Sequence, residues 1–299
     1  MLGFLSPIFE PGFLSNGPVQ TALIVGGVVA VVSGIVGTFT VIRGQSFAGH
    51  SLADIGTAGG SAAFLLGISP LFGFVAMNLM AAGVMESIGI RRPRGRDLAT
   101  GIVLGAALGL AALLLYLDTT ASSTTGATVN VLFGSIFTLP SSLVPVIAIF
   151  SVVAAGIVLA MYRPLLLSSV SSDLATAQGV RVRLVGIGYL AALAVAVSLS
   201  AVTIGAILST ALLIGPAATA LRLTNRTGRA AIIAAALGVV ATWLGVLLAY
   251  DSYYWFPSRG GWPVSFFVVT LVFVFYLLSQ VRSGTRAGTR RGSPATQAG

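Results

Sequence analysis

The sequence has 299 residues, of which 56% are hydrophobic and 8% carry a charge, and its mean hydropathy is +1.01. A soluble domain carries about 25% charged residues, so this composition excludes a water-facing globular protein and indicates a chain surrounded by a lipid bilayer. The net charge of +9 does not indicate a nucleic-acid partner, because the basic residues lie in short segments between apolar runs.

Nine apolar runs follow one another along the chain, each close to the 20 or so residues that a transmembrane helix needs. They predict an all-α polytopic bundle of eight or nine spans, because two closely spaced pairs leave the count open. The shorter stretch 126–138 can form a half-helix. The nine runs are 18–42, 46–67, 70–90, 98–117, 142–162, 185–201, 204–221, 230–250 and 263–281.

Three glycines in the run 98–117, namely Gly101, Gly105 and Gly109, recur at a spacing of four residues. Glycines on one helix face allow another helix backbone to approach closely. We therefore predict that this face packs against a neighbouring span.

All 16 basic residues are arginine, and their distribution predicts the orientation. Arginine is concentrated in cytoplasmic loops, and nine spans with the N-terminus outside and the C-terminus in the cytoplasm leave only Arg259 on the outer side. We expect a multi-pass protein of the cell membrane with an outer N-terminal segment, a transmembrane domain and a disordered basic cytoplasmic tail. These three parts are residues 1–17, 18–283 and 284–299. The first part lacks the basic region of a cleavable signal peptide.

Ionisable side chains are scarce inside the apolar runs, and the candidates are His50, Asp54 and Glu86. His50 and Asp54 are four residues apart, which places them on one face of a helix. Imidazole and carboxylate together suit Zn²⁺ or Mn²⁺. A hydrogen bond between the two side chains and a proton relay are the alternatives. Glu86 is either a further ligand or an interfacial residue near the arginine cluster that begins at Arg91.

Small residues surround the pair and leave room for an ion or for a neighbouring backbone. They are Gly49, Ser51, Ala53, Gly56, Gly59 and Gly60.

The loop 163–184 contains a pattern for a short helix at its centre. Ser172 or Asp173 can cap the helix at its start, and Gly179 suits a left-handed stop after it. Ala175 and Ala177 would give the helix a smooth surface, so we expect it either to dock into a groove of a partner or to lie as an ordinary loop helix.

No enzyme is predicted. A phosphate-binding P-loop requires a lysine, and the chain has none, so any ATP hydrolysis must take place on a separate chain. A Ser–His–Asp hydrolase would have to use His50, the one histidine, as its base, and no serine is marked as a nucleophile.

Four segments, in this order, resemble the membrane permease subunits of ATP-binding-cassette importers for zinc, manganese and iron, the ABC-3 family. Segment 43–67 resembles the family's stretch Arg…Gly-Asp-Ala-Leu-Ser-His…Gly…Leu-Leu-Gly. Segment 97–103, followed by 132–135, is similar to its middle helices. Loop 163–180 resembles its Arg-Pro…Asp-x-x-x-Ala…Gly-Val loop, and 205–220 is similar to its Leu-Leu-Ile-x-Pro-Ala-Ala signature.

The resemblance extends over roughly 20–280 and implies a permease subunit that imports zinc or manganese, with iron as a third candidate. It implies no permanently bound cofactor. Two copies of the chain would form the path, a cytoplasmic ATP-binding-cassette ATPase would drive transport, and an extracytoplasmic metal-binding protein would deliver the ion to the outer loops 118–130 and 250–262. The metal residues would be His50 and Asp54, with Glu86 as an additional candidate. The residues that couple to the ATPase would be Ser172, Asp173, Leu174, Ala175, Ala177 and Gly179.

One departure from the family pattern concerns the metal pair. The family usually has aspartate first and histidine four residues later, whereas here His50 stands first and Asp54 second. The swap keeps both ligands on one helix face and moves the imidazole by about one turn, which bears on the choice of metal more than on the fold.

Two other classes of function fit the residues alone. A secondary, proton-coupled carrier would use His50, Asp54 and Glu86 as a relay and would need no ATPase. If the chain is a membrane scaffold, substitution of His50 or Asp54 would lower its stability and would change no flux.

Overall fold

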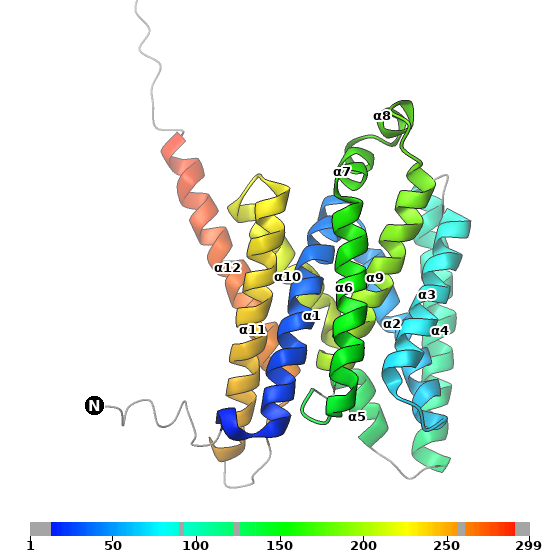
Figure 1. Cartoon of the computed structure of the whole chain (residues 1–299), viewed down its shortest axis with the longest axis vertical. Helices are drawn as coiled ribbons and strands as arrows, with labels where there is room; N and C mark the ends of the chain where they lie inside the picture. The colour runs from blue at the N-terminus through cyan, green and yellow to red at the C-terminus, as the bar shows by residue number, and fades with distance from the viewer. Residues whose placement is uncertain (1–12, 90–92, 122–125, 135, 256–260, 291–299) are drawn as a thin grey trace, which may run out of the picture.

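Backbone groups in a bilayer must form their hydrogen bonds inside the protein, so long apolar segments fold as helices. The computed structural model describes residues 13–89, 93–121, 126–134, 136–255 and 261–290, and these residues contain helices and no strand. Figure 1 shows the long helices side by side, with α7 and α8 at one end of the bundle and α5 at the other. In chain order the elements are η1 Phe13–Ser15, α1 Gly17–Ile42, α2 Ser46–Leu65, α3 Pro70–Gly89, α4 Pro93–Ala121, α5 Gly126–Phe133, η2 Ser141–Leu143, α6 Val144–Ala160, α7 Tyr162–Val170, α8 Ser172–Ala177, α9 Val182–Ile204, α10 Ala206–Leu223, α11 Thr227–Trp255 and α12 Val264–Arg290.

Eight of the described helices are long and apolar enough to cross a membrane, namely α1, α3, α4, α6, α9, α10, α11 and α12. Helix α2 makes the ninth long helix: its 20 residues span about 30 Å, but His50, Asp54 and several glycines make it less apolar than the others. The predicted polytopic all-α bundle is thus confirmed, and the predicted half-helix is α5, which has 8 residues.

Helix α9 forms much of the core, because every residue from 192 to 204 is buried. Polar contacts fix it to its neighbours: Ser200 Oγ lies 2.8 Å from Ser33 Oγ on α1, and Asn78 on α3 donates to Ser198 Oγ at 2.9 Å. Such hydrogen bonds between helices supply specificity where lipid removes the hydrophobic driving force.

Helices α2 and α3 approach each other closely through glycine. The backbones of Gly59 and Gly73 touch, so a Cβ atom on either would overlap the carbonyl oxygen of the other. A Cβ on Gly56 would lie 2.9 Å from the Asn78 side chain. The sequence predicts that the small residues near His50 leave room for an ion or for a neighbouring backbone. These glycines leave room for a neighbouring helix.

The chain reverses between α9 and α10 at one residue, Gly205, which has φ +91°. Its neighbour in space is the end of α5, where Gly134 has φ +84°. A Cβ on Gly205 would lie 2.5 Å from Phe133 Cα, and one on Gly134 would lie 2.5 Å from Gly205 N. Both backbone conformations favour glycine, and non-helical backbone at this depth is tolerated because protein covers it.

The glycine stripe of α4 does not pack as the sequence predicts. No described atom lies within 4 Å of a Cβ placed on Gly101, Gly105 or Gly109, so this face points away from the bundle and α4 contacts α2 through other residues. The prediction that this face packs against a neighbouring span is therefore wrong for the described residues.

The terminal parts are described only in part. Residues 1–12 and 291–299 lie outside the described residues, so the outer segment 1–17 and the disordered tail 284–299 remain predictions. Helix α12 continues to Arg290 and thus overlaps the start of the predicted tail.

We expect Gly205→Ala to destabilise the bundle by about 2–5 kcal/mol, since it adds backbone strain and a clash with α5. Gly156→Ala on α6, where a Cβ would meet no described atom, is the matched control and should leave stability unchanged or slightly raised. Thermal unfolding of the purified chains in detergent measures both, and an equal Tm for the two variants would show that the Gly205 contact does not matter.

Candidate functional site

His50 and Asp54 lie one turn apart on α2 and point to the same side. His50 Nε2 is 3.6 Å from Asp54 Oδ2, and their side chains are 50% and 20% exposed. The other ring nitrogen of His50, Nδ1, lies 3.2 Å from Thr210 Oγ1 on α10. The structure therefore brings the two predicted ligands together at the surface of the protomer, between α2 and α10.

The separation of these atoms suits two ligands of one cation. Zinc–nitrogen and zinc–oxygen bonds are about 2.0–2.2 Å long, which places neighbouring ligand atoms roughly 3–3.5 Å apart. The 3.6 Å between Nε2 and Oδ2 is close to this value and too long for a direct hydrogen bond. One cation could bind both side chains at this separation, and 3.6 Å is also the distance of a direct His–Asp ion pair.

The third candidate, Glu86, lies near the end of α3 and faces α9. Its Oε1 atom would be 3.1 Å from a Cβ atom on Gly186. In the described part of the chain, no three His, Cys, Asp or Glu side chains come close enough to hold one metal ion. Glu86 is therefore not brought to the pair, and the described residues place two candidate ligands here.

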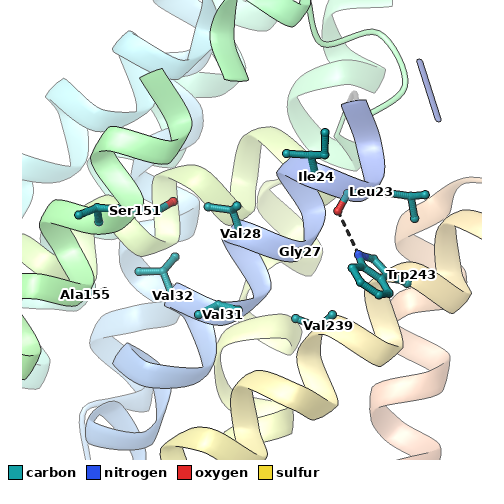
Figure 2. A pocket seen from close by; sticks show the side chains of 11 residues that line it. Leu23, Ile24, Gly27, Val28, Val31, Val32, Ser151, Ala155, Val239 and Trp243 are labelled. Atoms are coloured by element: carbon teal, nitrogen blue, oxygen red, sulfur yellow. Dashed lines mark hydrogen bonds between the residues drawn. The ribbon is translucent and has the colours of Figure 1, made fainter. Parts of the chain in front are cut away.

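A groove elsewhere lacks the chemistry of a cation site. It lies between α1, α6 and α11, has a volume of about 530 Å³, and is lined almost entirely by aliphatic side chains. Figure 2 shows Trp243 at its rim, with Nε1 donating to the carbonyl oxygen of Leu23 at 3.0 Å. Ser151 supplies the one hydroxyl in the lining, and no carboxylate or imidazole is present.

The predicted short helix of the loop is α8, which projects with α7 beyond the bundle (Figure 1). Its cap is Ser171 rather than Ser172 or Asp173, since the Ser171 hydroxyl accepts from the Leu174 amide at 3.2 Å. Gly179 has φ +79°, as the predicted left-handed stop requires.

The exposed face of α8 differs from the one that the alanines suggest. Ala175 is fully buried, whereas Leu174 is 48% exposed and Val170, just before the helix, is 83% exposed. Asp173, Ala177 and Gly179 are exposed as well. Leu174 and Val170 are therefore the large apolar side chains that this end of the loop exposes.

Arg43 connects this segment to the start of α2. Its Nη1 donates to Ser168 Oγ on α7 at 2.8 Å, and its guanidinium lies 5.1 Å from the centre of the Tyr189 ring on α9. Gly44, with φ +63°, then turns the chain directly into α2. The helix that carries His50 and the loop that carries α8 thus share one anchoring side chain.

Sequence reasoning missed two contacts of the site, those of Thr210 and Ser168. Both are hydroxyls on helices distant in sequence from their partners, and nothing in a single sequence indicates such pairings. The signal that was present for Thr210 is its place in the segment 205–220, which resembles a family signature.

Known proteins resemble this chain in sequence and in fold. The manganese transport system membrane protein MntC of Listeria innocua is 30% identical over 278 residues, which cover 93% of this chain and 96% of that protein. The manganese import system permease protein ScaB of Streptococcus pneumoniae is 32% identical over 236 residues, which cover 78% and 81% of the two chains. A chain in the solved structure of PsaBC from Streptococcus pneumoniae in complex with Fab superposes with a TM-score of 0.75 at 26% identity, over 90% of this chain and 92% of that one.

The model of the ABC 3 transport family matches residues 16–280. The match begins one residue before α1, ends within α12, and includes both the α2 pair and the α7–α8 loop. The sequence-based resemblance is confirmed, and this chain belongs to the ABC 3 transport family.

Proposed function

We propose that this chain is the permease subunit of an ATP-driven importer of a divalent transition metal, with manganese as the first candidate and zinc as the second. The observation that carries the proposal is the His50–Asp54 pair, two metal-type side chains 3.6 Å apart on α2. Family membership and the manganese transport named in two relatives support it. Iron remains a further candidate from the sequence.

The exposure of His50 supports a path shared between two copies. A half-exposed imidazole beside a carboxylate is costly against lipid, so this face needs to meet protein or water. A second copy of the chain facing α2 and α10 would cover it and add a second pair of ligands. Four ligands from two protomers form a transition-metal site of ordinary size, which one protomer does not supply.

The charge at one end of the bundle supports the orientation. Arg163 lies in α7, Arg181 and Arg183 follow α8, and Arg222 and Arg226 lie near the turn from α10 to α11, which Figure 1 shows at the same end. We assign this end to the cytoplasm by the positive-inside rule. A separate ATP-binding-cassette ATPase would dock there on α8, and a metal-binding protein would deliver the ion at the opposite, outer end.

We expect Asp54→Ala to reduce cellular manganese, or zinc, to the level found in cells without the gene. Under metal limitation, uptake should fall by at least about 10-fold, because the substitution removes one of two ligands. Elemental mass spectrometry of cells with matched protein levels measures this. Ser51→Ala, on the buried face of the same helix, is the control and should transport normally. Unchanged manganese, zinc and iron in Asp54→Ala and in the deletion would refute the metal importer.

We expect Asp173→Arg to weaken association with the ATPase by about 10-fold and uptake with it, since it replaces the acidic residue in the first turn of α8 by a cation that the helix dipole disfavours. Co-purification from membranes measures the association. Asn225→Arg, an exposed change between α10 and α11, controls for added charge at the same end. Equal ATPase recovery with both variants would exclude α8 as the docking helix.

A further inference from the structure

The side chain of Thr210 on α10 forms a hydrogen bond with the ring of His50 on α2. Its Oγ1 lies 3.2 Å from His50 Nδ1, within the range of a hydrogen bond. Other threonine hydroxyls on these helices donate to the carbonyl one turn earlier, as Thr219 does to Gly215 at 2.8 Å on the same helix. The hydrogen bond found for Thr210 runs instead to the ring of His50, across the gap between α10 and α2.

The contact with Thr210 bears on which ring nitrogen can bind a cation. Nε2 lies 3.6 Å from Asp54 Oδ2, so a cation held by Asp54 would be bound through this nitrogen. A proton on Nδ1 has Thr210 Oγ1 as an acceptor at 3.2 Å. When the neutral ring donates from Nδ1 to Thr210, Nε2 keeps the lone pair that a cation shared with Asp54 needs.

Thr210 is well placed to hold the ring rigidly. It follows the Gly205 reversal by five residues, and that reversal is fixed by backbone contact with the end of α5. Its β-branched side chain has few rotamers in a helix. Ser209, the residue before it, donates to Ala206 O at 2.8 Å and does not share this contact.

We infer that Thr210 is a positioning residue for metal transit: it orients His50 so that Nε2 and Asp54 face one divalent cation. The inference rests on the proposed function, because it gives the pair a metal to bind. Partners of this kind fix the tautomer of a histidine ligand, and their loss typically lowers metal affinity by 10- to 100-fold.

The test compares uptake of radioactive Mn²⁺, and separately of Zn²⁺, by cells that carry the full-length chain with its native partners. Thr210→Val keeps the shape and removes the hydroxyl, and we expect the metal concentration for half-maximal uptake to rise about 10- to 100-fold. Thr210→Ser restores the hydroxyl and should recover most of the lost affinity. Ser209→Ala, which removes a neighbouring hydroxyl that does not touch His50, is the matched control.

A double substitution separates positioning from general structure. If Thr210 acts through His50, then Thr210→Val should cause no further loss in a chain that already carries His50→Ala, whereas independent effects would multiply. Protein levels in the membrane fraction, with Thr210→Ser as the second variant, exclude a folding defect as the cause.

The outcomes distinguish this inference from the function on which it rests. Impaired uptake in His50→Ala with normal affinity in Thr210→Val would overturn the role of Thr210 and leave the importer intact. Equal uptake of both metals by the native chain and His50→Ala would overturn the metal site and the role of Thr210 together. Loss of affinity in Thr210→Val, with recovery in Thr210→Ser, supports both.

Discussion

His50 and Asp54 can lie within a bilayer only where protein or water covers them, and the packing of α2 against α3 and α10 meets part of that requirement. A charged group in hydrocarbon is costly, so the helix that bears the pair cannot be a peripheral one. Glycine contact at Gly59 and Gly73 brings α2 against α3, and Thr210 approaches from α10. The remaining side, which exposes half of the His50 side chain, is where the proposed second copy would complete the cover.

The reversal at Gly205 sets the position of α10 relative to this pair. A single residue, Gly205, joins α9 to α10, so neither helix can slide along its axis without the other. The backbone conformation of this residue favours glycine. The end of α5 fills the space beside the reversal, where Gly134 and Gly205 meet backbone to backbone. The buried core of α9, the half-helix α5 and the hydroxyl of Thr210 are thus parts of one packed unit, and the His50–Asp54 pair lies beside it.

The sequence predicts this architecture well where the signal is local. Apolar length predicts the spans, the spacing of His50 and Asp54 predicts their common face, and Gly179 predicts the end of α8. Contacts between distant segments are not local: the stripe at Gly101 resembles a packing face but meets no described neighbour. Ala175, which a surface pattern would expose, is buried, because a helix of 6 residues has too few turns for its periodicity to indicate which face is buried.

Arg43 offers a physical route from the α7–α8 segment to the helix that bears His50 and Asp54. Its guanidinium is held between Ser168 on α7 and the ring of Tyr189 on α9, and Tyr189 in turn donates to Thr40 near the end of α1 at 2.8 Å. Arg43 is also joined through the tight turn at Gly44 to α2, so in the proposed importer a displacement of α7 and α8 would act on the helix that bears His50. Spatial continuity of this kind becomes coupling only when both ends favour the same conformation of the shared element. The element that both ends share here is the start of α2, because ATPase docking would bias it through Arg43 and the metal would bias it through His50.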